Sequence, residues 1–170
     1  MHSVWVRLNA VFFFAISVLL AMSTMCALST IGYNGQPVVN KLKLNTLRSL
    51  RNHGGIDRAL FSFDLDVDFS PAFHWNIHQL NVFVVAEYET KKNAVNQIIL
   101  WDSIIEKKSD AHVKLKDEFV KFGLVDQGNE LRNHTVSLKV MWDNMPITGQ
   151  LWTEKEQKSH PLKLPSKYKN

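Results

Sequence analysis

Three aspartates alternate along one segment of the chain, at Asp64, Asp66 and Asp68. Every second side chain of an extended strand points to the same side, so these three carboxylates would share one face. Carboxylate oxygens are preferred ligands of Ca²⁺, and a cation site on that face is therefore conceivable. However, no glycine-containing calcium loop accompanies the aspartates. The residues between them are apolar, so we interpret the aspartates as the solvent-facing side of a half-buried strand.

Two histidines, His74 and His78, have the four-residue spacing of the zinc motif H-E-x-x-H. In that motif the glutamate follows the first histidine directly and the segment is helical. Here position 75 is tryptophan, and the segment follows Pro71 in a stretch that is typical of a loop. We therefore expect structural or surface histidines, with no metal and no cofactor bound by this chain.

No residue stands out as a nucleophile. The motif G-x-S-x-G is absent from the sequence, and the only cysteine, Cys26, lies in a long apolar segment. A catalytic cysteine or serine needs a base that activates it, and no motif in the sequence indicates such an activating environment for any Ser or Cys. The sequence thus predicts a protein without catalytic residues of its own.

The elements that would position these residues are β-strands. From Phe61 to Ser70 the apolar and polar residues alternate strictly, which is the period of a half-buried strand. Further runs rich in Val, Ile, Phe and Trp predict strands at Val38–Leu47, Leu80–Tyr88, Gln97–Ile105 and Thr135–Trp142.

Two further segments are less regular. Residues 48–58 contain Gly54-Gly55 and predict a loop, and residues 112–122 show no clean period and are compatible with a pair of strands. About seven strands without helical periodicity predict an all-β domain, a β-sandwich. No disulfide can form within this domain, because Cys26 precedes it. We expect Trp75, Trp101 and Trp142 to fill its core; the alternative is an exposed aromatic surface that binds a ligand.

The N-terminal segment predicts a membrane helix. No charged residue occurs from Leu8 to Asn40, and residues 10–31 are almost wholly apolar. About 22 residues at about 1.5 Å each span about 33 Å, enough for a hydrocarbon core of about 30 Å. A cleaved signal peptide ending at the small residues Ala21-Met22-Ser23 is the alternative, but the apolar run continues beyond that point, which favours an uncleaved signal-anchor.

Small residues recur along one side of this predicted helix. Their spacings of seven, four and three would let a second membrane helix approach closely on that side. The residues are Ala10, Ser17, Ala21 and Thr24.

The predicted organisation has four parts. Residues 1–9 form a short cytosolic N-terminus, residues 10–31 a transmembrane helix, residues 32–153 the β-sandwich and residues 154–170 a Lys-rich flexible tail. All sixteen acidic residues and nineteen of the twenty Lys and Arg residues follow Asn40, which gives that part a net charge of +3. These charges are scattered rather than gathered with aromatic residues on one face, and we therefore expect no nucleic-acid partner.

The central third of the chain resembles the signal peptidase complex subunit 3 family. The residues that carry the resemblance are Trp75-Asn76, Gln79, the run from Ala86 to Thr90, Asn96-Gln97 and Leu100-Trp101-Asp102. The start at Met1-His2-Ser3 and the later residues Asp126-Gln127-Gly128, Leu131-Arg132, Trp142, Pro146 and Gly149 are also similar to that family. Many members have lysine in the segment W-N-x-K-Q where this chain has His78, so a contact made through that cation is not expected here.

The resemblance implies a single-pass type II glycoprotein of the endoplasmic reticulum membrane with a lumenal β-sandwich. It also implies an accessory role, in which a separate catalytic serine protease subunit removes signal peptides and this chain supports and positions it alongside other small membrane subunits. Nascent secretory precursors would be partners only indirectly. The tail after Leu151 resembles the family poorly.

The orientation rests on observations that disagree. Lys41, Lys43, Arg48 and Arg51 follow the predicted helix while only Arg7 precedes it, and by the charge rule this distribution puts the domain in the cytosol. The sequon Asn133-His134-Thr135 and the resemblance indicate the lumen, with a glycan on Asn133.

Three classes of function remain. The first is an accessory subunit of a membrane protease complex, which the resemblance favours. The second is an independent secreted or lumenal β-sandwich binding protein whose N-terminal segment is cleaved, and the third is a small type II membrane enzyme.

Overall fold

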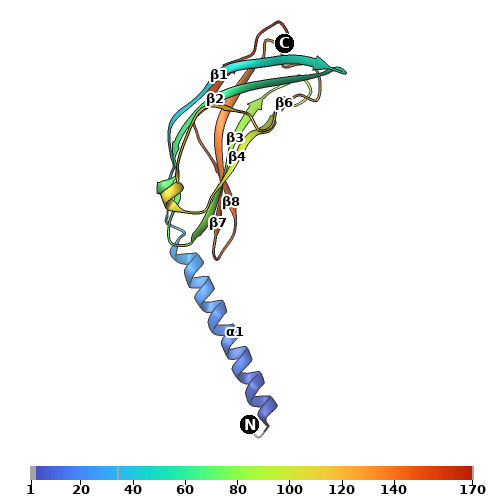
Figure 1. Ribbon diagram of the computed structural model, residues 1–170. Helices are drawn as coiled ribbons and strands as arrows, with labels where there is room; N and C mark the ends of the chain where they lie inside the picture. The colour runs from blue at the N-terminus through green and yellow to red at the C-terminus, as the bar shows by residue number, and fades with distance from the viewer. Residues whose placement is uncertain (1–2, 34, 170) are drawn as a thin grey trace.

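The computed structural model describes residues 3–33 and 35–169, which form one long helix followed by a domain of two β-sheets (Figure 1). The helix projects from one end of the sandwich, and the C-terminus lies at the opposite end (Figure 1). This confirms the predicted fold class of an N-terminal helix and an all-β domain.

Helix α1 covers Val4–Ser29 and contains no buried residue. It is long and apolar enough to cross a membrane, although a signal sequence would meet the same criteria. The hydroxyl groups of Ser17 and Thr24 donate to the carbonyls of Phe13 and Leu20, each at 2.8 Å, so these two polar groups are satisfied within the helix. The helix begins before the predicted Ala10 because the preceding residues are good helix formers or apolar, and it ends two residues before Ile31.

The strands form two antiparallel sheets. The first sheet has the order β1-β2-β5, with the short strand β6 also paired to β2, and it comprises β1 (Val38–His53), β2 (Ile56–Asp68), β5 (His112–Phe119) and β6 (Leu124–Val125). The second has the order β4-β3-β7-β8, with β9 also paired to β7, and it comprises β3 (Ile77–Tyr88), β4 (Asn96–Ile105), β7 (Thr135–Pro146), β8 (Trp152–Lys155) and β9 (His160–Lys163). Two short 3₁₀ turns, η1 (Ser70–Ala72) and η2 (Lys108–Asp110), lie in connections between strands of different sheets.

The core lies between the two sheets and follows the alternation in the sequence. Apolar side chains on the inner side of β2 and Phe69 just after it are 2% exposed or less; those of the strand are Ala59, Phe61, Phe63, Leu65 and Val67. From the other sheet, β3 contributes Val82 and Val84, and β7 contributes Val140 and Trp142. Burial of these side chains is the main stabilising contribution in a domain that has no disulfide.

Several strands are longer than predicted, β1 and β2 most of all, and residues 112–122 contain one strand instead of a pair. Residues 48–58, which we expected to form a loop, continue β1 and β2 and leave only Gly54-Gly55 as the turn. Both glycines have positive φ, +62° and +84°, which a tight hairpin turn requires and which glycine adopts without steric cost. Residues 112–119 form β5 alone.

The C-terminal segment differs from the predicted flexible tail. Strand β9 pairs with β7 through Leu162 and Val136, Leu164 is only 1% exposed, and Lys169 bridges to Leu50 of β1. Leu162 and Leu164 flank Lys163 and pack against the core, so backbone pairing and burial hold the segment in place.

Trp75 lies outside the core, contrary to our expectation. It is 63% exposed, whereas Trp101 and Trp142 are 6% and 1% exposed. The reason is its position in the loop between η1 and β3, where no strand alternation turns it inward.

Candidate functional site

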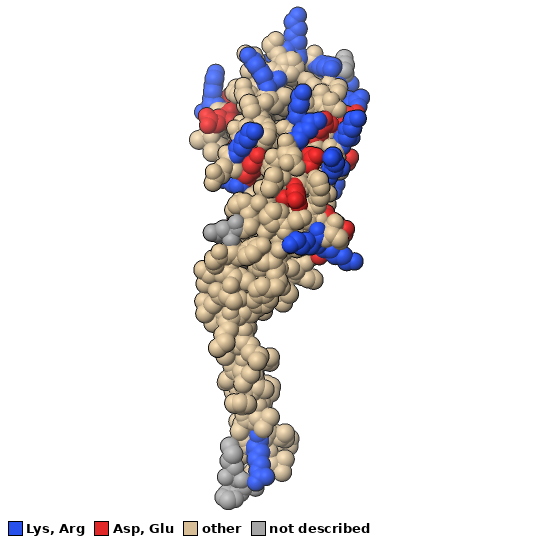
Figure 2. All heavy atoms as spheres, turned by 90° about the vertical axis from the view of Figure 1, so that its left-hand side faces the viewer, with Lys and Arg blue, Asp and Glu red and all other residues tan. Residues whose placement is uncertain are grey.

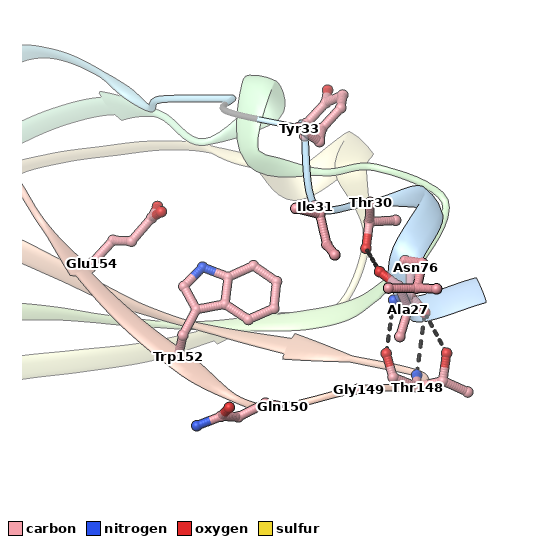
Figure 3. A pocket seen from close by; sticks show the side chains of 11 residues that line it. Ala27, Thr30, Ile31, Tyr33, Asn76, Thr148, Gly149, Gln150, Trp152 and Glu154 are labelled. Atoms are coloured by element: carbon pink, nitrogen blue, oxygen red, sulfur yellow. Dashed lines mark hydrogen bonds between the residues drawn. The ribbon is translucent and has the colours of Figure 1, made fainter. Parts of the chain in front are cut away.

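Three segments meet where the helix joins the sandwich. They are the last turns of α1, the loop that precedes β3 and the β7–β8 loop, and their residues line a cleft of about 480 Å³ (Figure 3). The segments are far apart in the sequence, so only the tertiary structure brings them together.

Asn76 connects these segments. Its side chain is almost fully buried, its Nδ2 donates to the Thr148 carbonyl at 2.8 Å, and its Oδ1 accepts from the Thr148 amide at 3.1 Å (Figure 3). Its backbone carbonyl accepts from the Ile147 amide at 2.7 Å. The carboxamide thus makes the two hydrogen bonds that a paired backbone peptide group would make, and it holds the β7–β8 loop against the loop before β3.

The helix takes part in the same network through Cys26. The Thr148 hydroxyl donates to the Cys26 sulfur at 2.7 Å, and the Cys26 thiol donates to Asn76 Oδ1 at 3.4 Å. At Gly149 the φ of +115° is a conformation that side-chain-bearing residues rarely adopt, and a Cβ there would contact Ala27 at 3.5 Å. Contacts from α1 to the domain therefore begin one turn before the helix ends.

The linker after α1 is also packed against the domain. The Tyr33 hydroxyl donates to the Pro71 carbonyl at 3.1 Å, and the Tyr33 ring packs against the His74 ring at an interplanar angle of 55°, with centroids 4.7 Å apart. A Cβ at Gly35 would come within 1.8 Å of the Pro71 carbonyl oxygen, so only glycine fits at this crossing. The linker and the cysteine network together fix the helix to the sandwich at two places.

The two histidines of the zinc-like spacing do not form a metal site. His74 lies in the loop, where its Nδ1 accepts from the Asn76 amide at 3.3 Å and burial lowers its pKa. His78 is an exposed residue of β3. In the ranges 3–33 and 35–169, no three His, Cys, Asp or Glu side chains lie close enough to hold a metal ion.

The alternating aspartates face outward, as predicted, and pair with neighbouring strands. Lys41 Nζ of β1 lies 2.6 Å from Asp64 Oδ2, and His112 Nε2 of β5 lies 2.8 Å from Asp66 Oδ1. Asp68 accepts from the Ser70 amide at 2.8 Å and so shapes the start of η1. The three carboxylates therefore have separate structural partners.

The Asp66 pairing predicts an acid-dependent contribution to stability. Hydrogen bonding from His112, with further donors from Asn40 and Lys114, lowers the Asp66 pKa from 3.8 to about 2. A lowered folded-state pKa contributes stability that is present above the unfolded value and is lost as the pH falls through the folded one. We expect Asp66→Asn to lower the melting temperature at neutral pH, with a difference from wild type that shrinks between about pH 4 and pH 2. Asp110→Asn, in η2, is the control. A difference in melting temperature between wild type and Asp66→Asn that stays constant with pH would contradict the stabilising role of the ionised Asp66.

The sequon lies at the end of the sandwich opposite the helix. Asn133 and Thr135 are exposed, and Asn133 has a positive φ of +58° in the turn that precedes β7. Since β7 runs from this turn to Pro146 beside the helix, its length separates Asn133 from α1.

The small residues of α1 are exposed at Ser17, Ala21 and Thr24 and half-buried at Ala10. Neither the glycan nor the helix partner is tested by these positions, and both stay predictions.

Comparison with known proteins shows the family of this chain. A family model described as "Signal peptidase subunit" matches residues 1–167, which include the helix, the linker and both sheets. The chain belongs to the signal peptidase subunit family. "Signal peptidase complex subunit 3" of Gallus gallus is 36% identical over 157 residues, covering 89% of this chain and 87% of that protein. The proteins of the same name from Drosophila melanogaster and Homo sapiens are 32% and 33% identical, covering 99% and 89% of this chain and 97% and 87% of their own lengths.

Family membership confirms the resemblance seen in the central strands, but the sequence did not predict the network at the junction. Asn76 belongs to the motif that carries the resemblance, yet its partner Thr148 follows 72 positions later. Cys26 was expected only as a membrane residue. The sequence shows Trp75 next to Asn76 but not that the asparagine is buried and the tryptophan exposed. That difference in burial, which would have indicated the network, is visible only in the structure.

Proposed function

We propose that this chain is a non-catalytic accessory subunit of the signal peptidase complex in the endoplasmic reticulum membrane. In this role it supports and positions a catalytic serine protease subunit that removes signal peptides from nascent secretory proteins. The observation that carries the proposal is the family match over residues 1–167, which includes both the membrane-length helix and the sandwich. The direct contact of α1 with the domain through Cys26, Asn76 and Thr148 supports it, because a scaffold must hold its two parts in a fixed relation.

The acidic groups of the domain also favour a structural role. Asp126 accepts from the Tyr88 hydroxyl at 2.9 Å, and burial together with this carboxylate raises the pKa of Tyr88. Asp57 accepts from Asn52 and from the Tyr168 hydroxyl, at 2.8 Å and 2.9 Å. These contacts hold loops and the C-terminal segment, rather than aligning a base with a nucleophile.

The proposed orientation is type II, with residues 1–9 in the cytosol, α1 across the bilayer and the domain in the lumen. Asn133 then carries an N-glycan, and its place at the end of the sandwich farthest from α1 supports this because a glycan there has room. The small-residue side of α1, with Ala10, Ser17, Ala21 and Thr24, is the proposed contact with a helix of another subunit.

Asn133→Gln is expected to remove one glycan from the membrane-inserted chain. The measurement is the gel mobility of wild type and variant before and after glycosidase treatment, and Thr135→Ala should reproduce the change because it destroys the same sequon. Asn129→Gln, in a neighbouring turn outside any sequon, is the control. Digestion of the domain by protease added outside sealed microsomes would contradict the lumenal orientation.

Loss of this chain should reduce the cleavage of secretory precursors. We expect uncleaved precursors to accumulate in depleted membranes, and a version carrying His74→Gln and His78→Gln to restore cleavage, since neither histidine has a catalytic role in the proposal. Normal processing in depleted membranes would exclude an accessory role. If the histidine changes abolished cleavage while the complex stayed assembled, the chain would not be non-catalytic. A mature chain that begins at Thr24 would instead favour the independent binding protein.

A further inference from the structure

The three segments that meet at the end of the sandwich beside α1 lack charged residues. In the described part of the chain, their cleft is also lined by Glu154 of β8, whose carboxylate accepts from the Trp142 indole N–H. No Asp, Glu, Lys or Arg occurs from Leu8 to Asn40, from Phe69 to Ala86 or from Asn144 to Trp152. Figure 2 shows the consequence on one face: the Lys, Arg, Asp and Glu residues gather on the part of the domain away from the helix, and the part next to it shows none. The charged connection between β4 and β5, which contains η2, lies beside η1 (Figure 1).

The uncharged segments at this end also expose large apolar side chains. Trp75 is 63% exposed and Ile147 is 65% exposed, and Ile31 and Leu151 are exposed beside them. Trp75 adjoins the buried Asn76, and Ile147 donates its amide to the Asn76 carbonyl, so the two side chains belong to the loops that the network holds together. We call Ile31, Trp75, Ile147 and Leu151 the apolar rim.

The position of Cys26 along α1 determines how close the loop before β3 and the β7–β8 loop lie to the membrane. Arg7 is the last charged residue before the helix turns apolar, and the nineteen positions from Arg7 to Cys26 correspond to about 28 Å of helix. The hydrocarbon core of a bilayer is about 30 Å thick, and slightly thinner in the endoplasmic reticulum. If Arg7 stays at one surface of the membrane, Cys26 reaches the hydrocarbon boundary at the other. Asn76 and Thr148, which contact Cys26, must then lie at that boundary as well.

We propose that the apolar rim inserts into the interfacial layer of the lipid bilayer around α1. The occupant of this surface is the boundary between headgroups and acyl chains, where tryptophan is enriched because its ring is apolar and its N–H remains hydrogen-bonded. Insertion fixes the tilt of the sandwich relative to the membrane, because the rim contacts lipid beside the point where α1 leaves it. The inference rests on the proposed passage of α1 across the bilayer, but not on which side the domain faces.

His74 and His78 are the histidines of these uncharged segments, which also contain Cys26 and Tyr33. His74 packs against the Tyr33 ring, and burial lowers the His74 pKa, which favours the neutral imidazole that a site at the lipid boundary requires. His78 points out from β3.

The test compares lipid contact at matched positions in the full-length chain. In a Cys26→Ser background, a single cysteine is placed at Ile147 and, as control, at Val95, which is 61% exposed in the β3–β4 turn at the opposite end of the sandwich. A third variant, Leu19→Cys, reports on the middle of α1. Each protein is labelled with a small fluorophore and reconstituted into phosphatidylcholine vesicles whose acyl chains carry a nitroxide quencher in both leaflets.

Lipid quenching at position 147 should be several-fold stronger than at position 95 and approach that at position 19. Equal, weak quenching at 147 and 95 together with strong quenching at 19 would overturn the insertion alone. Weak quenching at all three positions would show that α1 does not span, and would overturn its proposed membrane placement too. If position 147 were shielded from aqueous iodide only in the assembled complex and not in lipid vesicles, the rim would be a contact with another subunit, and the lipid proposal would be wrong.

Trp75→Glu gives a second measurement that does not depend on labelling. A carboxylate at this exposed position leaves the core unchanged but is costly to place at the lipid boundary. We expect the variant to melt as wild type does in detergent and to increase protease access to the β7–β8 loop in vesicles. Val95→Glu is the matched control, and equal protease access in the two variants would contradict insertion.

Discussion

Replacement of Trp142 by alanine is expected to unfold the sandwich or bring it close to unfolding. Truncation of a fully buried tryptophan costs about 3–5 kcal/mol, a large part of the roughly 5–15 kcal/mol by which a domain is stable. The side chain is only 1% exposed, and its ring packs edge to face against Phe69, with centroids 6.2 Å apart. Its indole N–H donates to Glu154 at 3.0 Å, so the substitution removes a hydrogen bond as well as packing.

The measurement is thermal or denaturant unfolding of the full chain in mild detergent, followed by near-UV circular dichroism. Trp142→Phe should cost less than Trp142→Ala, because it keeps most of the ring and loses the hydrogen bond to Glu154. Trp75→Ala is the control, since it removes an exposed ring of the same type and should leave the melting temperature nearly unchanged. An unchanged melting temperature for Trp142→Ala would show that the ring is not part of the core.

Replacement of Asn76 by alanine should loosen the contact between the helix and the sandwich. The substitution leaves the amide and the carbonyl of Thr148 without their partner, and each buried group left unpaired costs about 1–3 kcal/mol. It also removes the oxygen to which Cys26 donates, and so weakens the contact between α1 and the domain. The effect should be concentrated at the junction, because the strands themselves keep their ladders.

Hydrogen exchange followed by mass spectrometry separates these effects. The β7–β8 loop and the last turn of α1 should exchange faster in Asn76→Ala, while β2 should exchange as in wild type. Asn129→Ala, which changes an exposed asparagine in a distant turn, is the control. Unchanged protection of Thr148 would show that the carboxamide does not hold the loop.

The local sequence pattern was sufficient to predict the elements in which apolar residues recur with a regular period or in one continuous run. The strict alternation from Phe61 to Phe69 predicted both the strand and its buried face, and the uncharged N-terminal run predicted a helix of membrane length. The aspartates between the apolar residues were correctly interpreted as an outer face. In each case the pattern of neighbouring residues along the chain is enough to determine which side chains are buried.

Tertiary contacts decided the rest of the structure. The Lys-rich C-terminal segment lacks a long alternating run, yet β9 is ordered because the exposed backbone of β7 is available for pairing and Leu164 finds a place in the core. Trp75 looks like a core residue by type, yet the loop that carries it turns it outward.

The sequence by itself therefore determined the class of the fold, the membrane-length helix and the family of the chain. Only the tertiary structure decided that Asn76 and Cys26 join the helix to the sandwich, through a threonine 72 positions after the one and 122 after the other. The physical reason is that a strand face is set by a period of two residues, whereas a buried polar side chain is satisfied by whichever group the whole fold brings within about 3 Å of it.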